Sequence, residues 1–188
     1  QDILKVDLKN KIKQEKEKNG FEKVKIVANL PYYITTPIIM KLLEEELDLE
    51  SITVMIQKEV ADRLTAIPGK KNTGAITYTV YYYTDSEEIL EVPKDSFIPE
   101  PEVTSEVIKL NIRKTPIVEP KNKEKMFKII KCAFTQRRKT LLNSLVNTNI
   151  LDSKQQGINM LNSLNINENI RPEELTIEQF KEISDFLK

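Results

Sequence analysis

The chain has no histidine among its 188 residues, and it has a single cysteine, Cys132. Without an imidazole, Ser-His-Asp and Cys-His catalysis and most zinc sites are excluded, and we expect no metal centre. One cysteine cannot form a disulfide within the chain, which suits a reducing, cytoplasmic compartment. Whatever chemistry takes place must use groups other than imidazole.

Long apolar runs are also missing. No segment approaches the roughly 18 apolar residues of a transmembrane helix. The apolar fraction of 39% and charged fraction of 31% are typical of a soluble globular protein. The first residue is Gln1, and the residues after it already read as part of an element, so we expect that an N-terminal segment is lacking.

A net charge of one sign is missing too, since 29 basic residues balance 29 acidic ones. The two signs are nevertheless separated along the chain. Lys121 to Lys139 holds eight basic residues and one acid, whereas Asp85 to Glu106 holds eight acids and one lysine. A local basic face can bind nucleic acid although the total is neutral. Two solvated surfaces of opposite sign remain an equal alternative.

The first half of the chain alternates between strand and helix patterns. Residues 24–29 and 51–57 read as buried strands. Each precedes a helical pattern, at 37–47 with Thr36 as N-cap and Pro37 as first helical residue, and at 58–66. This order predicts a parallel sheet, in which ligands bind beyond the carboxyl ends of the strands.

The segments that follow are more varied. Residues 74–85 fit either a strand or a helix. Two strands at 88–93 and 103–112 flank a proline-rich stretch that proline holds extended, and they could form an antiparallel edge.

From about residue 118 onward the strand pattern disappears. Helical patterns occupy 126–134 and 136–145, and Thr176 with Gln179 forms a capping box that opens a last helix. We therefore predict a catalytic domain at 1–115 and a helical domain at 118–188.

The stretch "NLPY", Asn29 to Tyr32, follows the first predicted strand and suggests a specific chemistry. An exocyclic amine on a nucleobase is a poor nucleophile because its lone pair is delocalised. The Asn29 side-chain oxygen and the Leu30 carbonyl, held by Pro31, could accept its two N–H groups, and Tyr32 offers a face for stacking. The alternative is an Asn-Pro turn with two packing tyrosines.

Several motifs together resemble the ribosomal RNA adenine dimethyltransferases, in particular the small-subunit branch. They are "NLPYYITTPI", "QDILKVDL", "MIQKEVADRL", "VPKDSFIPEPEVTSEVIKL", "AFTQRRKTLLNSL" and "RPEELTIEQF", in family order over nearly the whole chain. The resemblance implies the C-terminal part of a Rossmann-like class I methyltransferase sheet, mostly parallel with an antiparallel edge. A small all-α domain would follow it, and residues 74–80 would be helical.

By this resemblance, the reaction is the transfer of methyl groups from S-adenosylmethionine to N6 of two adjacent adenines near the 3′ end of 16S rRNA. The partner is then the immature 30S subunit, and the full enzyme is expected to be a monomer. The implied roles are amine binding, base stacking, cofactor contact and rRNA contact. Asn29, Leu30, Pro31 and Tyr32 are implied to bind the amine, and Phe97 to stack on the base. Asp2 and Asn29 are implied to contact the cofactor, and Arg137, Arg138 and Lys139 to contact the rRNA.

The sequence departs from the family pattern in one important respect. The Gly-x-Gly cofactor loop and the acidic residue on the following strand are absent from this chain. Because those groups make up most of a cofactor site, we expect this chain alone to bind S-adenosylmethionine weakly and to be inactive. A shortened sheet would also expose strand edges, so self-association is possible. Tyr33 stands where the family commonly has Asn.

Three rival functions remain open. A large-subunit rRNA adenine methyltransferase and a DNA adenine methyltransferase would use similar amine chemistry. A ribosome-assembly factor that only docks on the immature subunit would need no turnover.

Overall fold

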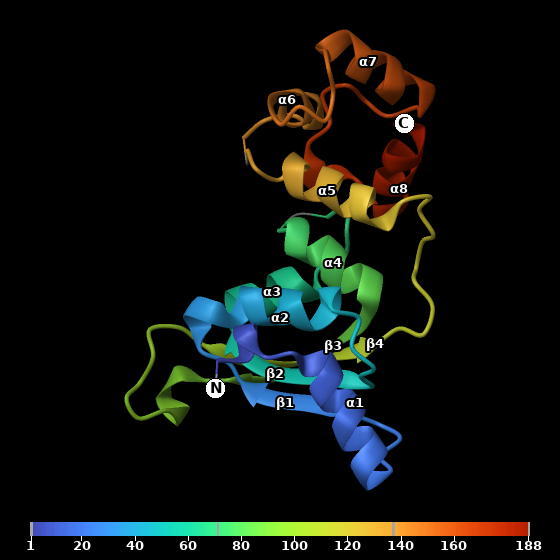
Figure 1. Ribbon diagram of the computed structural model, residues 1–188. Coiled ribbons are helices and arrows are strands. Elements are labelled where there is room, and N and C mark those ends of the chain that lie inside the picture. Colours follow the sequence, from blue (N-terminus) through green and yellow to red (C-terminus); the bar gives the residue numbers. More distant parts are fainter. Residues whose placement is uncertain (1, 71, 137, 188) are drawn as a thin grey trace. The chain divides into compact units, whose positions relative to one another are not determined.

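The computed structural model describes residues 2–70, 72–136 and 138–187 (Figure 1). By contacts, the chain divides into two compact units. The sheet unit comprises Gln1–Thr65 and Tyr83–Thr115, and the helical unit comprises Ala66–Tyr82 and Pro116–Lys188.

A four-stranded sheet in the order β1-β2-β4-β3 forms the sheet unit. Its strands are β1 (Lys25–Asn29), β2 (Ser51–Gln57), β3 (Thr84–Val92) and β4 (Ser105–Ile112). β1 pairs with β2 in parallel, and β4 is antiparallel to both β2 and β3. The predicted antiparallel pairing of the two late strands is confirmed. Residues Ile52, Val54, Ile56, Ile108 and Leu110 of the two central strands form its buried core.

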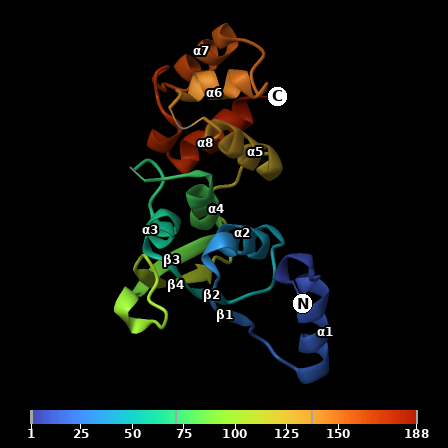
Figure 2. The same ribbon diagram turned by 90° about the vertical axis from the view of Figure 1, so that its left-hand side faces the viewer.

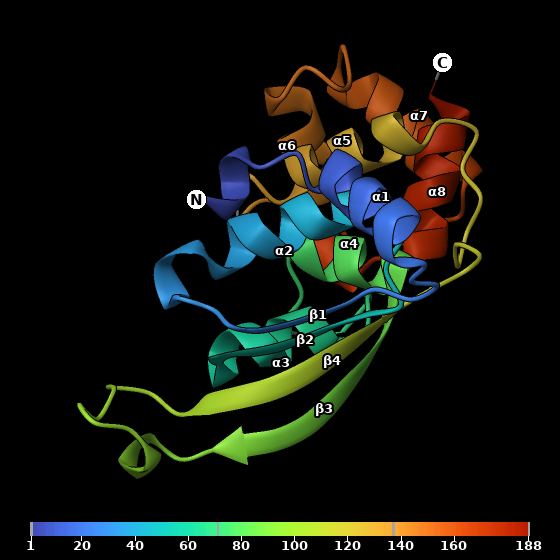
Figure 3. The same cartoon turned by 60° about the horizontal axis from the view of Figure 1, so that its bottom comes forward.

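The prediction that the first strand is buried was wrong for one of its faces. β1 lies at the edge of the sheet and alternates between exposed and half-buried residues. Val27 is 79% exposed. No helix among the described residues covers this face, whereas α2 and α3 lie on the opposite face (Figures 1 and 3).

The helices of the sheet unit are α1 (Leu8–Asn19), α2 (Thr35–Glu44) and α3 (Lys58–Thr65), with short 3-10 turns η1 (Ile3–Lys5), η2 (Tyr32–Ile34) and η3 (Lys94–Ser96). Helix α2 begins at Thr35, so the predicted N-cap at Thr36 was wrong. Because η2 leads directly into α2, no separate side-chain cap is formed. The helical pattern predicted at 37–47 is confirmed only as far as Glu44, where α2 ends. Ile39, Leu42 and Leu43 lie on its buried face, and Leu47 is buried beyond the end of the helix.

The helical unit contains α4 (Ala75–Tyr83) except for its last residue, which belongs to the sheet unit. Its other elements are α5 (Lys123–Ala133), α6 (Leu141–Asn147), α7 (Lys154–Ser163), η4 (Pro172–Glu174) and α8 (Ile177–Phe186) (Figure 2). The residues predicted as either strand or helix at 74–85 thus form α4 and the start of β3. The capping box of α8 is confirmed, since Thr176 Oγ1 accepts the Gln179 N–H and Gln179 Oε1 accepts the Thr176 N–H.

Tyr78 explains why residues 66–82 pack with the helical unit although the sequence places them in the first domain. Its side chain is fully buried. The ring contacts Phe180 at 4.9 Å and Phe134 at 5.5 Å between centroids. Its hydroxyl lies 2.6 Å from the Leu175 carbonyl. Burial of the hydroxyl raises the Tyr78 pKa well above its ordinary value.

Across residues 2–70, 72–136 and 138–187, no helix combines the length and the apolar character that crossing a lipid bilayer requires.

Candidate active site

The predicted amine-binding stretch lies where β1 ends. Asn29 is the last residue of β1, and the Leu30 N–H continues the ladder by donating to the Met55 carbonyl at 3.2 Å. The Leu30 side chain is buried, which anchors this point of the chain to the core. The stretch therefore leaves the sheet from a fixed position, as ligand-binding loops of α/β sheets do.

The next carbonyl along the chain is already engaged. The Pro31 carbonyl accepts the Ile34 N–H at 3.1 Å and the Thr35 hydroxyl at 3.1 Å. By contrast, neither the Asn29 side chain nor the Leu30 carbonyl has a hydrogen-bond partner among the residues that the structure describes. Asn29 is exposed rather than turned into the core. Two adjacent acceptor oxygens are therefore free to bind donors from a ligand.

A cavity of about 310 Å³ opens beside these acceptors. Besides the four residues of the NLPY stretch it is lined by Phe97, Pro99 and Pro101. The structure thus brings Phe97, 65 or more positions away in the sequence, to the same slot as Tyr32. We call this cavity the base slot. It combines aromatic and proline walls with a few polar acceptors, as small-ligand sites generally do.

The wall formed by Tyr32 is tied to β4. The Tyr32 hydroxyl lies 2.7 Å from the hydroxyl of Ser105, the first residue of β4. Ser105 is fully buried. This serine belongs to the motif "VPKDSFIPEPEVTSEVIKL", but the sequence does not predict a role for it. No residue close to position 105 in the sequence indicates a partner at position 32.

Lys58 fixes the neighbouring end of the same strand. Its backbone N–H donates to the Thr104 carbonyl at 3.0 Å. Its ammonium lies 3.3 Å from the carboxylates of Glu91 and Glu106. The hydrogen bond to Glu91, and then the one to Glu106, raise the Lys58 pKa above its ordinary value of 10.5. The Glu106 side chain is only 5% exposed and would be costly to leave unpaired.

We expect Lys58→Met to destabilise the protein, because it leaves the buried Glu106 carboxylate without its cation. A raised pKa stabilises the folded state below the unfolded pKa and loses this effect as pH rises through the folded value. The stability difference from the unmodified protein should therefore be constant from about pH 6 to about pH 9 and shrink only in strong alkali. Urea titrations across this range measure it.

Lys13→Met is the matched control, since the one ion pair of Lys13 within the described residues is an exposed one with Glu17 on α1. It should change stability little at any pH. Equal effects of the two substitutions would show that the cluster around Lys58 does not stabilise β4.

Asp2 does not line the base slot, but it lies at a neighbouring cavity that has Leu30 and Pro31 in common with the slot. Its carboxylate accepts the Leu4 N–H at 3.0 Å as the N-cap of η1. Asp2 also lines a second cavity of about 550 Å³, together with Ile3, Leu30 and Pro31. Apolar walls with one carboxylate fit the purine end of a nucleoside cofactor. The ribose and methionine portions of such a cofactor would need a Gly-x-Gly turn. The chain does not supply this turn with its glycines, which are Gly20, Gly69, Gly74 and Gly157.

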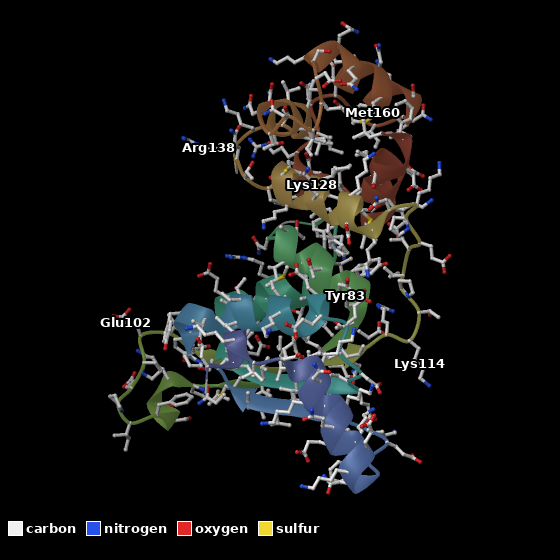
Figure 4. All side chains as sticks on the ribbon, in the orientation of Figure 1. Tyr83, Glu102, Lys114, Lys128, Arg138 and Met160 are labelled. Atoms are coloured by element: carbon white, nitrogen blue, oxygen red, sulfur yellow. The ribbon has the colours of Figure 1, made fainter. Side chains whose placement is uncertain are left out.

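The predicted basic cluster is arranged differently from the sequence expectation. Helix α6 begins at Leu141, because the Thr140 side chain caps it by accepting the Asn143 N–H. Arg138 (Figure 4) and Lys139 therefore lie in the turn between α5 and α6, not on a helix, and both are exposed. Arg137 lies outside the described residues. The structure places these residues in the helical unit and the base slot in the sheet unit.

No group of three or more histidine, cysteine or acidic side chains that could hold a metal ion occurs in the described part of the chain.

Comparisons with known proteins agree with the motifs. The family model described as ribosomal RNA adenine dimethylase matches residues 1–188. The ribosomal RNA small subunit methyltransferase A of Bacillus pumilus is 47% identical over 191 residues, covering 100% of this chain and 64% of that protein. The relative of the same name from Clostridioides difficile is 48% identical and is covered to 63%, with 100% of this chain matched. The chain thus spans a little under two thirds of these relatives.

A solved structure supports the fold. The crystal structure of a dimethyladenosine transferase from Plasmodium falciparum matches with a TM-score of 0.68 at 21% identity, covering 94% of this chain and 76% of that one. At this identity the likeness concerns the Rossmann-like methyltransferase fold. With the family match over its whole length and relatives at nearly half identity, the chain belongs to the ribosomal RNA adenine dimethylase family.

Proposed function

We propose that this chain contributes the adenine-binding part of an enzyme that dimethylates N6 of two adjacent adenines near the 3′ end of 16S rRNA. The observation that carries the proposal is the base slot, where Asn29 and Leu30, whose two acceptor oxygens have no partner among the described residues, adjoin Tyr32 and Phe97. The relatives' name, small subunit methyltransferase A, favours the small-subunit RNA over the large-subunit alternative.

Binding of the amine is the step that this chain's residues explain. An adenine that enters the slot must first leave its stack, which costs a few kcal/mol. Stacking on Tyr32 and Phe97 offsets this, at about 1–3 kcal/mol per base contact. Acceptance of both N6–H groups by Asn29 and Leu30 favours a more tetrahedral nitrogen with a more available lone pair.

Methyl transfer itself requires no side-chain base. S-adenosylmethionine supplies the electrophilic methyl group when bound. Asn29 and Leu30 would hold the amine in line with that methyl group, so that the new N–C bond would replace the methyl–sulfur bond. The cofactor would be left as a neutral thioether, and the extra proton on the nitrogen would pass to water. Catalysis by this chain is then mainly positioning, which is consistent with a sequence that contains no histidine. We propose that Asp2 and Asn29 contact the cofactor beside the slot.

We further propose that the partner is the immature 30S subunit in the cytoplasm, contacted by the exposed basic residues of the helical unit. Arg138 and Lys139 in the α5–α6 turn are the first candidates, with Arg137 beside them in sequence. Lys128 and Lys131 of α5 are further exposed basic residues of the same unit. Phosphate contacts of this kind make affinity fall steeply with salt, which pelleting with 30S particles at increasing salt would measure.

The function is tested with a chimaera in which this chain is joined to the part of the Bacillus pumilus relative that lies outside the match. Unmethylated 30S particles and labelled cofactor are the substrates, and mass spectrometry locates the product. The proposal expects dimethylation of two adjacent adenines in 16S rRNA. A product in 23S rRNA, or docking on the particles without transfer, would overturn it.

The cofactor should bind to the chimaera but not to this chain alone. The chain offers Asp2 and an apolar cavity but no glycine-rich turn for the ribose and methionine portions. Isothermal calorimetry with S-adenosylmethionine should therefore show no micromolar binding to the isolated chain. Micromolar affinity of the isolated chain would mean that its own residues complete the site.

A further inference from the structure

The orientation of the Tyr32 ring depends on a contact far away in the sequence. Tyr32 lies in η2, a three-residue turn, and its side chain is half-buried. A ring in such a position can adopt several rotamers, and only some of them line the base slot. The 2.7 Å contact between the Tyr32 and Ser105 hydroxyls is the one hydrogen bond that holds the ring from its far end in the described structure.

Ser105, in contrast, cannot move to follow the ring. It is fully buried, and it pairs with Gln57 in the antiparallel ladder between β2 and β4. The residues on either side are also held. The Thr104 carbonyl accepts the Lys58 N–H, and the Glu106 carboxylate pairs with the Lys58 ammonium. The serine is therefore the fixed partner, and the tyrosine ring is the adjustable one.

We propose that Ser105 is a positioning residue that orients Tyr32 as a wall of the base slot before a base enters. This proposal rests on the proposed function, in which the slot takes an adenine. Ser105 does not line the slot itself. Its effect on base binding must pass through the Tyr32 hydroxyl, so removing either hydroxyl should have the same consequence.

The test is an NMR titration of the full chain with adenosine, which reports affinity and the upfield ring-current shift of the adenine protons. Ser105→Ala and Tyr32→Phe should each weaken binding about fivefold, the value of one lost hydrogen bond, and reduce the ring-current shift. The double variant should be no weaker than either single variant, because both remove the same contact. Ser105→Thr, which keeps the hydroxyl, should restore most of the shift.

Ser86→Ala is the matched control, since Ser86 is an exposed serine on the adjacent strand β3, and it should bind as the unmodified chain does. Unchanged binding by Ser105→Ala, or additive losses in the double variant, would overturn the positioning role. If Ser105→Ala fails to fold, unchanged binding by Tyr32→Phe, whose ring is half-buried, overturns it equally. Absence of adenosine binding by the unmodified chain would instead contradict the proposed function.

Discussion

Asn29→Ala in the chimaera is expected to lower kcat for methyl transfer by about 100- to 1,000-fold, the typical effect of removing one preorganised polar group from a catalytic site. The side-chain oxygen of Asn29 is exposed at the slot and unpaired in the described structure, so its loss removes an acceptor from the amine and leaves the fold intact. Single-turnover rates on 30S particles measure the effect.

The control for this substitution is Asn19→Ala, at the end of α1, where the exposed amide donates to the Glu15 carboxylate and to no other group that the structure describes. It should leave the rate unchanged. Because Asn29 is also proposed to contact the cofactor, the rate must be compared at saturating S-adenosylmethionine. If Asn29→Ala then retained full kcat, acceptance of the amine by this side chain would not be part of catalysis.

Phe180→Ala is expected to have the largest effect on stability, a loss of about 3–5 kcal/mol in the free energy of unfolding. Phe180 is fully buried on α8 and meets the ring of Tyr78 edge to face. Its removal opens a cavity among α4, α5 and α8 and withdraws an aromatic contact. Urea or thermal unfolding followed by circular dichroism would show it.

Phe186 offers a matched control on the same helix. Its side chain is 48% exposed, so Phe186→Ala should cost far less than Phe180→Ala. Equal losses for the two substitutions would contradict the packing of α8 described above.

The sequence predicted those features that are set by neighbouring residues. The Thr176 capping box and the helical spacing of Ile39, Leu42 and Leu43 in α2 depend on residues three or four positions apart, and both are confirmed. The family motifs predicted which residues to examine, and the structure brings the NLPY stretch and Phe97 to one cavity.

Features that depend on distant contacts could not be predicted in this way. Tyr78 joins α4 to the helical unit through Phe134 and Phe180, more than 50 residues further along the chain. The link between Ser105 and Tyr32 is of the same kind. The error at Arg138 and Lys139 has a local cause, since helical periodicity does not reveal that Thr140 caps the helix and excludes the residues before it.

The crystal structure of the chimaera with adenosine bound would test the central claim most directly. The account predicts that the adenine ring lies between Tyr32 and Phe97, with N6 at hydrogen-bonding distance, about 3 Å, from both Asn29 Oδ1 and the Leu30 carbonyl. An adenine bound with N6 pointing away from these two oxygens, or bound outside the base slot, would contradict it.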